Sequence, residues 1–278
     1  MDAACVGIVE FMNVNVVRVD LAQARSALPT AARQTSELVR SLPDPQASVP
    51  GLDWTIGQTA AHMVAAAVNY PRYATGQATP ETTIDLREAN LDRIRLVGSQ
   101  DLTELANRLV EETDRYLEQT AELAADHRVP FFGGTTVSMA AQTAILLGEY
   151  LVHGHDLARA AGRPWRIDPS HAVLVIAAIT TLMPRYLDRE AASGIKVSYD
   201  IHIRGGPRFI FHVTGDEATI EPSGAAQVDC RISADPVAFL LVAYGRQTQW
   251  RPVLLGKMTA WGRRPWKAFG LTRLLVNP

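Results

Sequence analysis

Glu149 and His153 are the residues whose types and spacing most directly suggest chemistry. They stand four positions apart in a stretch with helical patterning, so both project from one helix face. A carboxylate and an imidazole one turn apart are how a helix presents two metal ligands. The neighbouring residues are apolar, and a buried carboxylate without a partner is costly. The pair is therefore either part of a metal site or a hydrogen-bonded pair on a solvated face.

His62 is the candidate for a third ligand. It lies in a segment rich in small residues, which leaves room for a site in a helical core. Two histidines and one carboxylate leave coordination positions open, as in catalytic rather than structural metal sites. His155 is a poorer partner for His153, because side chains two positions apart on a helix diverge by about 200°.

Asp156 follows His153 by one turn of the same helix. It could accept a hydrogen bond from an imidazole N–H and so orient a metal ligand. The alternative is a surface carboxylate paired with Arg159 or Arg163. The spacing favours neither interpretation.

Helical patterning covers the first two thirds of the chain. Hydrophilic caps precede apolar residues at helical spacing, and Thr55 with Gln58 forms a capping box. Pro29 predicts that the first helix is kinked or starts later. The patterns predict a four-helix bundle followed by one further helix, with no strand before the next domain. The predicted helices cover residues 21–42, 55–76, 101–117, 137–161 and 169–187, and residues 130–136 are predicted as a loop.

Alternation with a period of two replaces the helical period after about residue 190. Residues 197–203 and 209–213 alternate around Gly205-Gly206, which predicts a β-hairpin. Further strands are expected at 219–221, 228–233 and 257–261, with helices at 235–244 and 265–275. The chain is thus predicted to join a helical domain, residues 17–190, to a small α+β domain with an antiparallel sheet, residues 191–278.

Composition narrows the function classes. The 278 residues carry a net charge of -2, which argues against a nucleic-acid-binding module. Apolar stretches are interrupted well before the roughly 20 residues that a membrane span needs. Cys5 and Cys230 provide no disulfide framework, so a reducing, cytoplasmic location is expected. Residues 1–16 do not resemble a signal peptide and form an extension of unknown role, within which Met12 is a plausible alternative start.

Two motifs carry a family resemblance. The segment 51–63, GLDWTIGQTAAHM, places Trp54 eight residues before His62. The segment 148–165, GEYLVHGHDLARAAGRPW, contains Glu149, His153 and an Asp-Leu-Ala sequence before Ala-Gly. Together they resemble the DinB-like, metal-binding helical bundle of mycothiol-dependent maleylpyruvate isomerases over residues 17–190. In that resemblance the metal ligands fall on His62, Glu149 and His153.

The resemblance implies a metalloenzyme. A divalent metal, most plausibly Zn²⁺, would stabilise the thiolate of mycothiol near neutral pH. The thiolate would add to an electrophilic small molecule between the two domains. Departure of the thiol afterwards would make the protein an isomerase, and retention of the adduct would make it a thiol S-transferase. Neither the substrate nor a monomeric or homodimeric state follows from the motifs.

The C-terminal segment has a resemblance of its own. Residues 235–262, DPVAFLLVAYGRQTQWRPVLLGKMTAWG, resemble the end of a sterol-carrier-protein-like domain, a five-stranded sheet covered by helices. In the isomerase group such a domain can contribute an arginine to the active site. Gly245-Arg246 matches the recurrent Gly-Arg, which makes Arg246 the candidate catalytic arginine, with Arg263 and Arg264 behind it. The alternative for Arg246 is a surface charge at the end of a helix.

Two other function classes remain open. The C-terminal domain could bind a lipid or sterol while the bundle is structural. Aromatic strand residues (Tyr199, Phe209 and Phe211) and the apolar segment 237–243 favour this, although they equally suit an ordinary sheet core. The bundle could also bind metal without catalysing a reaction.

Overall fold

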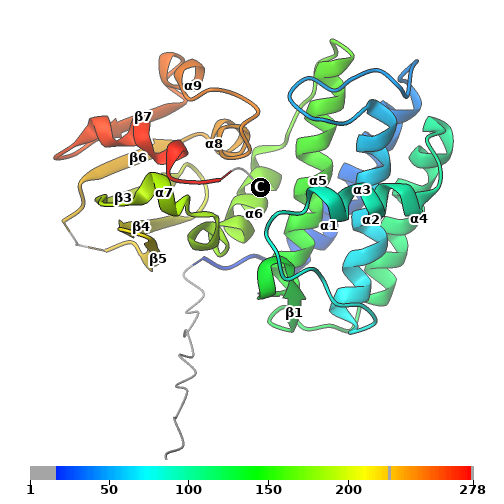
Figure 1. Ribbon diagram of the computed structural model, residues 1–278, viewed down its shortest axis with the longest axis horizontal. Coiled ribbons are helices and arrows are strands. Elements are labelled where there is room, and N and C mark those ends of the chain that lie inside the picture. Colours follow the sequence, from blue (N-terminus) through cyan, green and yellow to red (C-terminus); the bar gives the residue numbers. More distant parts are fainter. Residues whose placement is uncertain (1–16, 225–226, 277–278) are drawn as a thin grey trace, which may run out of the picture.

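Helices precede a sheet along the chain. The computed structural model describes residues 17–224 and 227–276, so the predicted extension over residues 1–16 lies outside the described residues. The helical part and the sheet part lie next to each other (Figure 1). In the described ranges, no helix is long and apolar enough to cross a membrane.

Four long helices form the predicted bundle. Each begins directly after a side chain that accepts a hydrogen bond from the first turn, at Asp20, Thr55, Asp101 and Ser138. The capping box of Thr55 and Gln58 is confirmed. The helices are α1 (Leu21–Arg40), α2 (Ile56–Ala74), α4 (Leu102–Gln119) and α5 (Met139–Ala160). The first helix runs through Pro29, so the prediction of a later start is wrong.

The bundle core is apolar, with a few buried polar groups, most of which are paired. Helices α1 and α2 each pack against both α4 and α5. Buried hydroxyls bond between α4 and α5, at 2.7 Å for Thr113 and Tyr150 and 2.8 Å for Tyr116 and Thr143. Since each buried polar atom in these pairs has a partner, the pairs fix the two helices in register at little desolvation cost.

Three elements of the helical part depart from the prediction. Helix α3 (Arg87–Val97) was not expected, because Ile94 is its one buried residue and no apolar stripe marks it. Strands β1 (Arg128–Phe131) and β2 (Thr135–Ser138) form a hairpin where a loop was predicted, so the absence of strands before residue 190 is wrong. The turn η1 (Phe132–Gly134) places Gly133 and Gly134 at positive φ, which glycine adopts without strain.

A connecting segment joins the two parts. The predicted helix 169–187 is shorter, because α6 (Pro169–Thr180) ends before the 3-10 turn η2 (Met183–Tyr186). The short helix α7 (Arg189–Ala192) then leads to the first strand of the large sheet. Helix α6 contacts both α5 and α8, so it forms much of the contact between the helical and the sheet parts.

The large sheet has the order β5-β4-β3-β6-β7. Its strands are β3 (Lys196–Ile203), β4 (Arg208–Thr214), β5 (Glu217–Pro222), β6 (Cys230–Ala234) and β7 (Met258–Trp261). The predicted hairpin of β3 and β4 is confirmed. The predicted antiparallel pairing is confirmed for three of the four strand pairs, but β3 and β6 are parallel. Strand β5 runs in the direction of β3, and the chain then crosses back to add β6 at the free edge of β3.

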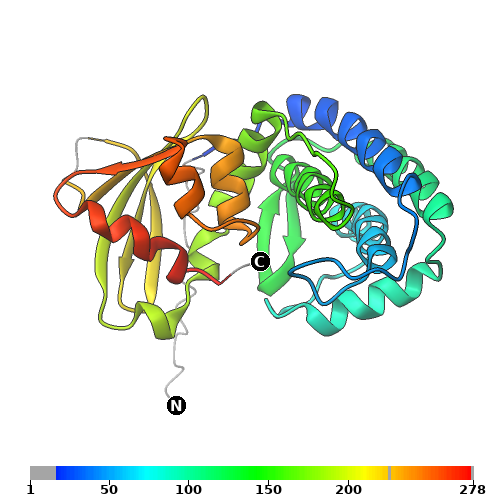
Figure 2. The same cartoon turned by 90° about the horizontal axis from the view of Figure 1, so that it is seen from above.

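Helical segments cover one face of this sheet (Figure 2). They are α8 (Pro236–Ala243), α9 (Trp250–Leu254) and η3 (Pro265–Arg273). Helix α8 is apolar around most of its circumference, because it packs between the sheet and α6. Tyr199, Phe209 and Phe211 are fully buried in the sheet core.

Candidate metal centre

His62, Glu149 and His153 meet at one point between α2 and α5. One potential ligand atom from each lies within 4.8 Å of the other two. Glu149 Oε2 is 3.3 Å from His62 Nε2 and 3.4 Å from His153 Nε2. The three side chains are 12%, 19% and 11% exposed, so the cluster is sheltered but remains open on one side.

The local fold explains this convergence. Glu149 and His153 are separated by one turn of α5, and α2 packs alongside α5. His62 lies near the middle of α2, next to alanines that let the two helices approach. Two imidazole nitrogens and a carboxylate oxygen are a donor set that suits Zn²⁺, and the separations are short enough for one ion to reach all three. The residues present therefore fit a divalent metal.

Two aromatic residues complete the wall of the cluster. The Trp54 ring lies 4.7 Å from the His62 ring and 6.0 Å from the His153 ring, measured between centroids. Tyr70 donates a hydrogen bond of 3.1 Å to Glu149 Oε1, the oxygen that faces away from the histidines. Tyr70 therefore orients the carboxylate so that Oε2 is left for the histidines or a cation.

Asp156 lies behind His153 and links it to the other domain. His153 Nδ1 is 3.2 Å from Asp156 Oδ2, and the side chain of Asp156 is 1% exposed. Arg246 donates hydrogen bonds to the same carboxylate, with Nε 3.1 Å from both oxygens and Nη2 2.9 Å from Oδ2. Arg159 and Arg163 instead bond to the loop carbonyl of Pro50 and to Ser41, so neither pairs with Asp156.

The electrostatics of the cluster favour a bound cation. Burial alone would raise the pKa of the Glu149 carboxyl, but hydrogen bonds from His153 and His62 outweigh it and hold the pKa far below its usual range. Burial also lowers the pKa of His62. Burial would lower the pKa of His153 as well, but its hydrogen bonds with Asp156 and Glu149 outweigh burial and raise it. An ionised carboxylate next to a neutral imidazole is the state in which both groups can ligate a metal.

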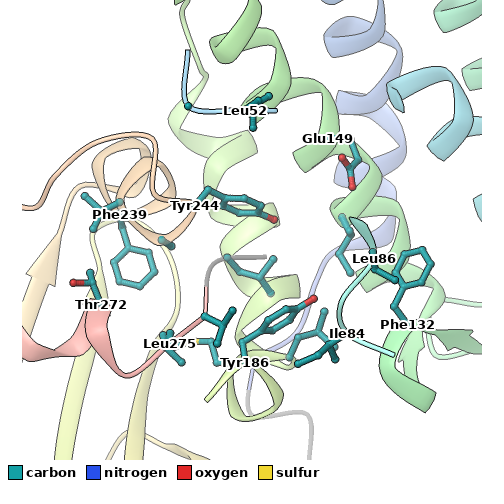
Figure 3. A pocket seen from close by; sticks show the side chains of 18 of the residues that line it. Leu52, Ile84, Leu86, Phe132, Glu149, Tyr186, Phe239, Tyr244, Thr272 and Leu275 are labelled. Atoms are coloured by element: carbon teal, nitrogen blue, oxygen red, sulfur yellow. The ribbon is translucent and has the colours of Figure 1, made fainter. Parts of the chain in front are cut away.

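The cluster lies in the wall of a large cavity between the two domains. The cavity has a volume of about 1210 Å³, and residues of both domains line it. Figure 3 shows Glu149 and Phe132 on the bundle side facing Tyr244, Phe239 and Leu275 of the C-terminal domain. A position between domains is common for ligand sites.

Several residues at this site were not predicted from the sequence. Tyr70 follows His62 by about two helical turns, so spacing could have indicated it. Tyr186 and Tyr244 line the cavity from segments far along the chain, and no pattern placed them there. Arg246 was expected to face the substrate, but it binds Asp156 and does not line the cavity. The other two candidate arginines, Arg263 and Arg264, do not line the cavity either. Arg264 pairs with Asp229, with 3.5 Å between Nη1 and Oδ1.

The helices thus carry a candidate metal cluster of two histidines and a glutamate, which the sheet part faces across a cavity. Residues 28–158 match the family model of the mycothiol maleylpyruvate isomerase N-terminal domain. The helical part of this chain is therefore similar to the N-terminal domain of mycothiol-dependent maleylpyruvate isomerases.

Solved structures agree at the level of the fold. The crystal structure of the mycothiol-dependent maleylpyruvate isomerase has a TM-score of 0.53 at 19% identity, covering 87% of this chain and 93% of that chain. A mutant of that isomerase also scores 0.53, at 18% identity and the same coverage. Sterol carrier protein 2 from Yarrowia lipolytica covers 35% of this chain at 13% identity, and its TM-score of 0.24 is too low to classify the C-terminal domain. A comparison with curated proteins found no match.

Proposed function

We propose that this protein is a mycothiol-dependent metalloenzyme that adds the thiolate to an electrophilic carbon. The observation that carries the proposal is the convergence of His62, Glu149 and His153 in the wall of a cavity. The match of residues 28–158 to the mycothiol maleylpyruvate isomerase N-terminal domain supports mycothiol as the thiol. The bundle end of the cavity also suits a polar thiol, since Asn69 and Asn90 line it.

His62, Glu149 and His153 would hold the metal, for which Zn²⁺ is the best candidate. When bound there, the ion would lower the pKa of a thiol and favour its thiolate form. Asp156 accepts a hydrogen bond from the Nδ1–H group of His153, which leaves the lone pair of Nε2 to ligate a metal. The protein's own contribution is thus the orientation of the ligands and the exclusion of bulk water.

The proposed reaction balances without an additional reactant. Sulfur forms a bond to the β-carbon of a conjugated carbonyl compound. The electron pair of the C=C bond then forms the enolate bond between the α-carbon and the carbonyl carbon, and the π pair of the carbonyl group moves to its oxygen. Rotation about the resulting single bond, followed by loss of the thiolate, restores the double bond with changed geometry and makes the protein an isomerase. Protonation of the enolate carbon instead gives a stable thioether and makes it an S-transferase.

Two tyrosines are placed to stabilise the developing negative charge on that oxygen. Tyr186 and Tyr244 line the cavity, and the negative charge of Glu149 raises the pKa of each, after burial as the larger cause. Both phenols therefore stay protonated and can donate a hydrogen bond to an oxyanion. Arg246 takes a positioning role instead, because its guanidinium is fully engaged by Asp156 and the carbonyl of Tyr244.

The proposal is tested by zinc content and turnover of the same preparations. We expect the wild type to bind zinc and to turn over an enone in the presence of mycothiol. S-transfer is followed as mycothiol consumption, and isomerisation as a change in double-bond geometry at constant mycothiol. His62→Ala and Glu149→Gln should lose zinc and lower turnover by at least about 10²-fold, since each removes one of three ligands. His202→Ala, which removes an exposed histidine of β3, should change neither.

The outcomes separate the function classes. Turnover without a zinc requirement would contradict the role of the cluster. Zinc binding without turnover of any electrophile would favour a metal-binding protein that catalyses no reaction. Binding of a fatty acid or sterol that is unaffected by chelator, together with no turnover, would favour the lipid-binding alternative.

A further inference from the structure

The inter-domain cavity differs between its two ends. At the bundle end, the metal-ligand candidate His62 and five charged side chains line it: Asp53, Asp85, Arg87, Arg93 and Glu149. From Ile179 onward, the described residues that line it include no charged side chain. The second half, formed by the connecting segment and the C-terminal domain, is therefore an uncharged and largely apolar chamber.

The cations near the metal centre already have partners. Arg93 pairs with Glu81, and its guanidinium also lies 5.0 Å above the centre of the Phe132 ring. Arg87 pairs with Asp85 at 2.6 Å, and its side chain is 84% exposed. Among the described residues, no unpaired lysine or arginine lines the cavity. Apart from a bound divalent metal, a dianionic electrophile would thus meet no free cation among the described residues that line the cavity, where it would lie near the carboxylates of Asp53 and Glu149.

The apolar half also reaches the surface through apolar residues. Trp266 and Phe269 line the cavity and are 62% and 38% exposed. Phe269 stacks on Trp250, with ring centroids 4.8 Å apart. Large exposed apolar residues next to an apolar cavity indicate a ligand with an apolar part. The total volume of about 1210 Å³ exceeds the usual range of roughly 300–1,000 Å³ for a small-molecule pocket.

We propose that the ligand of this cavity is an uncharged molecule with a polar carbonyl end and a long apolar tail. The carbonyl end lies beside Tyr186, Tyr244 and the metal centre, and the tail extends past Phe239 and Leu275 into the C-terminal half. This inference rests on the proposed function only in identifying that ligand as the electrophilic substrate. It assigns the second domain a role in substrate specificity.

Binding and turnover are measured separately on the full chain. Calorimetric titration with saturated 2-alkanones, from 2-butanone to 2-undecanone, requires neither metal nor thiol. The affinity should rise about threefold to fourfold per methylene until the chamber is filled, because each methylene leaves water. With zinc and mycothiol present, kcat/KM for alkyl vinyl ketones should rise with chain length in the same order.

A charge placed in the apolar half provides the structural test. Thr272 is exposed, lines the cavity and is labelled in Figure 3. Thr272→Asp should weaken binding of 2-undecanone by at least about tenfold and leave 2-butanone unchanged, since an alkyl tail that reaches this position would displace water from the carboxylate, which is costly. Arg273→Gln makes the same change in net charge at a neighbouring exposed residue that does not line the cavity, so it should leave both affinities unchanged.

Affinities that do not depend on chain length, or maleate binding more tightly than 2-undecanone, would overturn the inference. So would equal effects of Thr272→Asp and Arg273→Gln. If chain-length-dependent binding is observed but no vinyl ketone reacts, the ligand class is supported and the proposed function fails. The two failures are thus distinguishable.

Discussion

Arg246 of the C-terminal domain and Asp156 of α5 form an ion pair, with Nη2 2.9 Å from Oδ2, directly behind the metal-ligand candidate His153. The arginine side chain is 13% exposed and the aspartate 1%, so the pair is largely removed from water. Arg246 therefore helps to orient His153, and it does so through Asp156.

We predict that Arg246→Met lowers zinc affinity by about 10–100-fold, as expected for loss of a group that supports a metal ligand. Arg246→Lys should lower zinc affinity less than Arg246→Met, because lysine keeps the positive charge but loses the bidentate contact with Asp156. Competition with a chromophoric chelator measures both. Arg264→Met, at an arginine paired with Asp229, is the control. Unchanged zinc affinity with a lower kcat would mean that Arg246 acts on the substrate, as the sequence had indicated.

Gly154→Ala should destabilise the protein by about 1–3 kcal/mol. A Cβ at residue 154 would lie 2.3 Å from Cζ2 of Trp165, whose indole N–H donates to the carbonyl of Leu151 at 3.1 Å. This clash should outweigh the roughly 0.5–1 kcal/mol that alanine gains over glycine within a helix. Urea unfolding measures the difference. Gly270→Ala, where a Cβ meets no atom within 4 Å, is the matched control. Equal stability of the two variants would show that Trp165 is not packed against Gly154.

Asp200 predicts a pH-dependent contribution to stability. Its side chain is 4% exposed, and Arg208 Nη2 lies 2.6 Å from Asp200 Oδ2. The hydrogen bond from Arg208 is the main cause that lowers the pKa of Asp200. A folded-state pKa below the unfolded one stabilises the protein above the unfolded pKa of about 4, and this stabilisation is lost as the pH falls through the folded pKa.

Asp200→Asn should therefore cost about 1–2 kcal/mol at pH 7, a value reduced by the exposure of Arg208. The difference from wild type should shrink progressively below about pH 4, where the aspartate of the wild type is protonated. Urea unfolding across this pH range tests the prediction. A difference that stays constant on acidification would show that the charge of Asp200 does not contribute.

Cys230 should be unreactive in the folded protein. It is buried in the sheet, and this burial raises its pKa to about 11. In a Cys5→Ser variant, where Cys230 is the remaining cysteine, Ellman's reagent at pH 8 should react at least ~100-fold more slowly in buffer than in denaturant. Rapid reaction in buffer would contradict the placement of Cys230 in β6.

Local sequence signals predicted much of the fold because their causes are local. The caps at Asp20, Thr55 and Asp101 act within one helical turn, and the structure places helix starts directly after each. Alternating residues between 196 and 214 similarly predicted a hairpin, since one face of each strand is buried. Helix α3 was missed for the same reason, because an element with one buried residue has almost no apolar periodicity.

Non-local relationships could not be predicted in this way. The parallel pairing of β3 with β6 depends on where the chain crosses back after β5, and residue alternation is identical in parallel and antiparallel neighbours. The strands of the hairpin β1–β2 have four residues each, and the turn Phe132–Gly134 that joins them contains two glycines, so the sequence resembled a loop.

By itself, the sequence determined the three candidate ligands. The spacing of Glu149 and His153 follows from the geometry of one helix, and His62 was recognisable by its small neighbours and by the motif around it. Tertiary structure alone decided the partners of these residues. Arg246 binds Asp156, which lies 90 residues earlier in the chain. This contact forms, and Tyr186 and Tyr244 come to line the cavity, because α6 packs against α8. Such contacts depend on the summed packing of many residues, and no spacing along the chain encodes them.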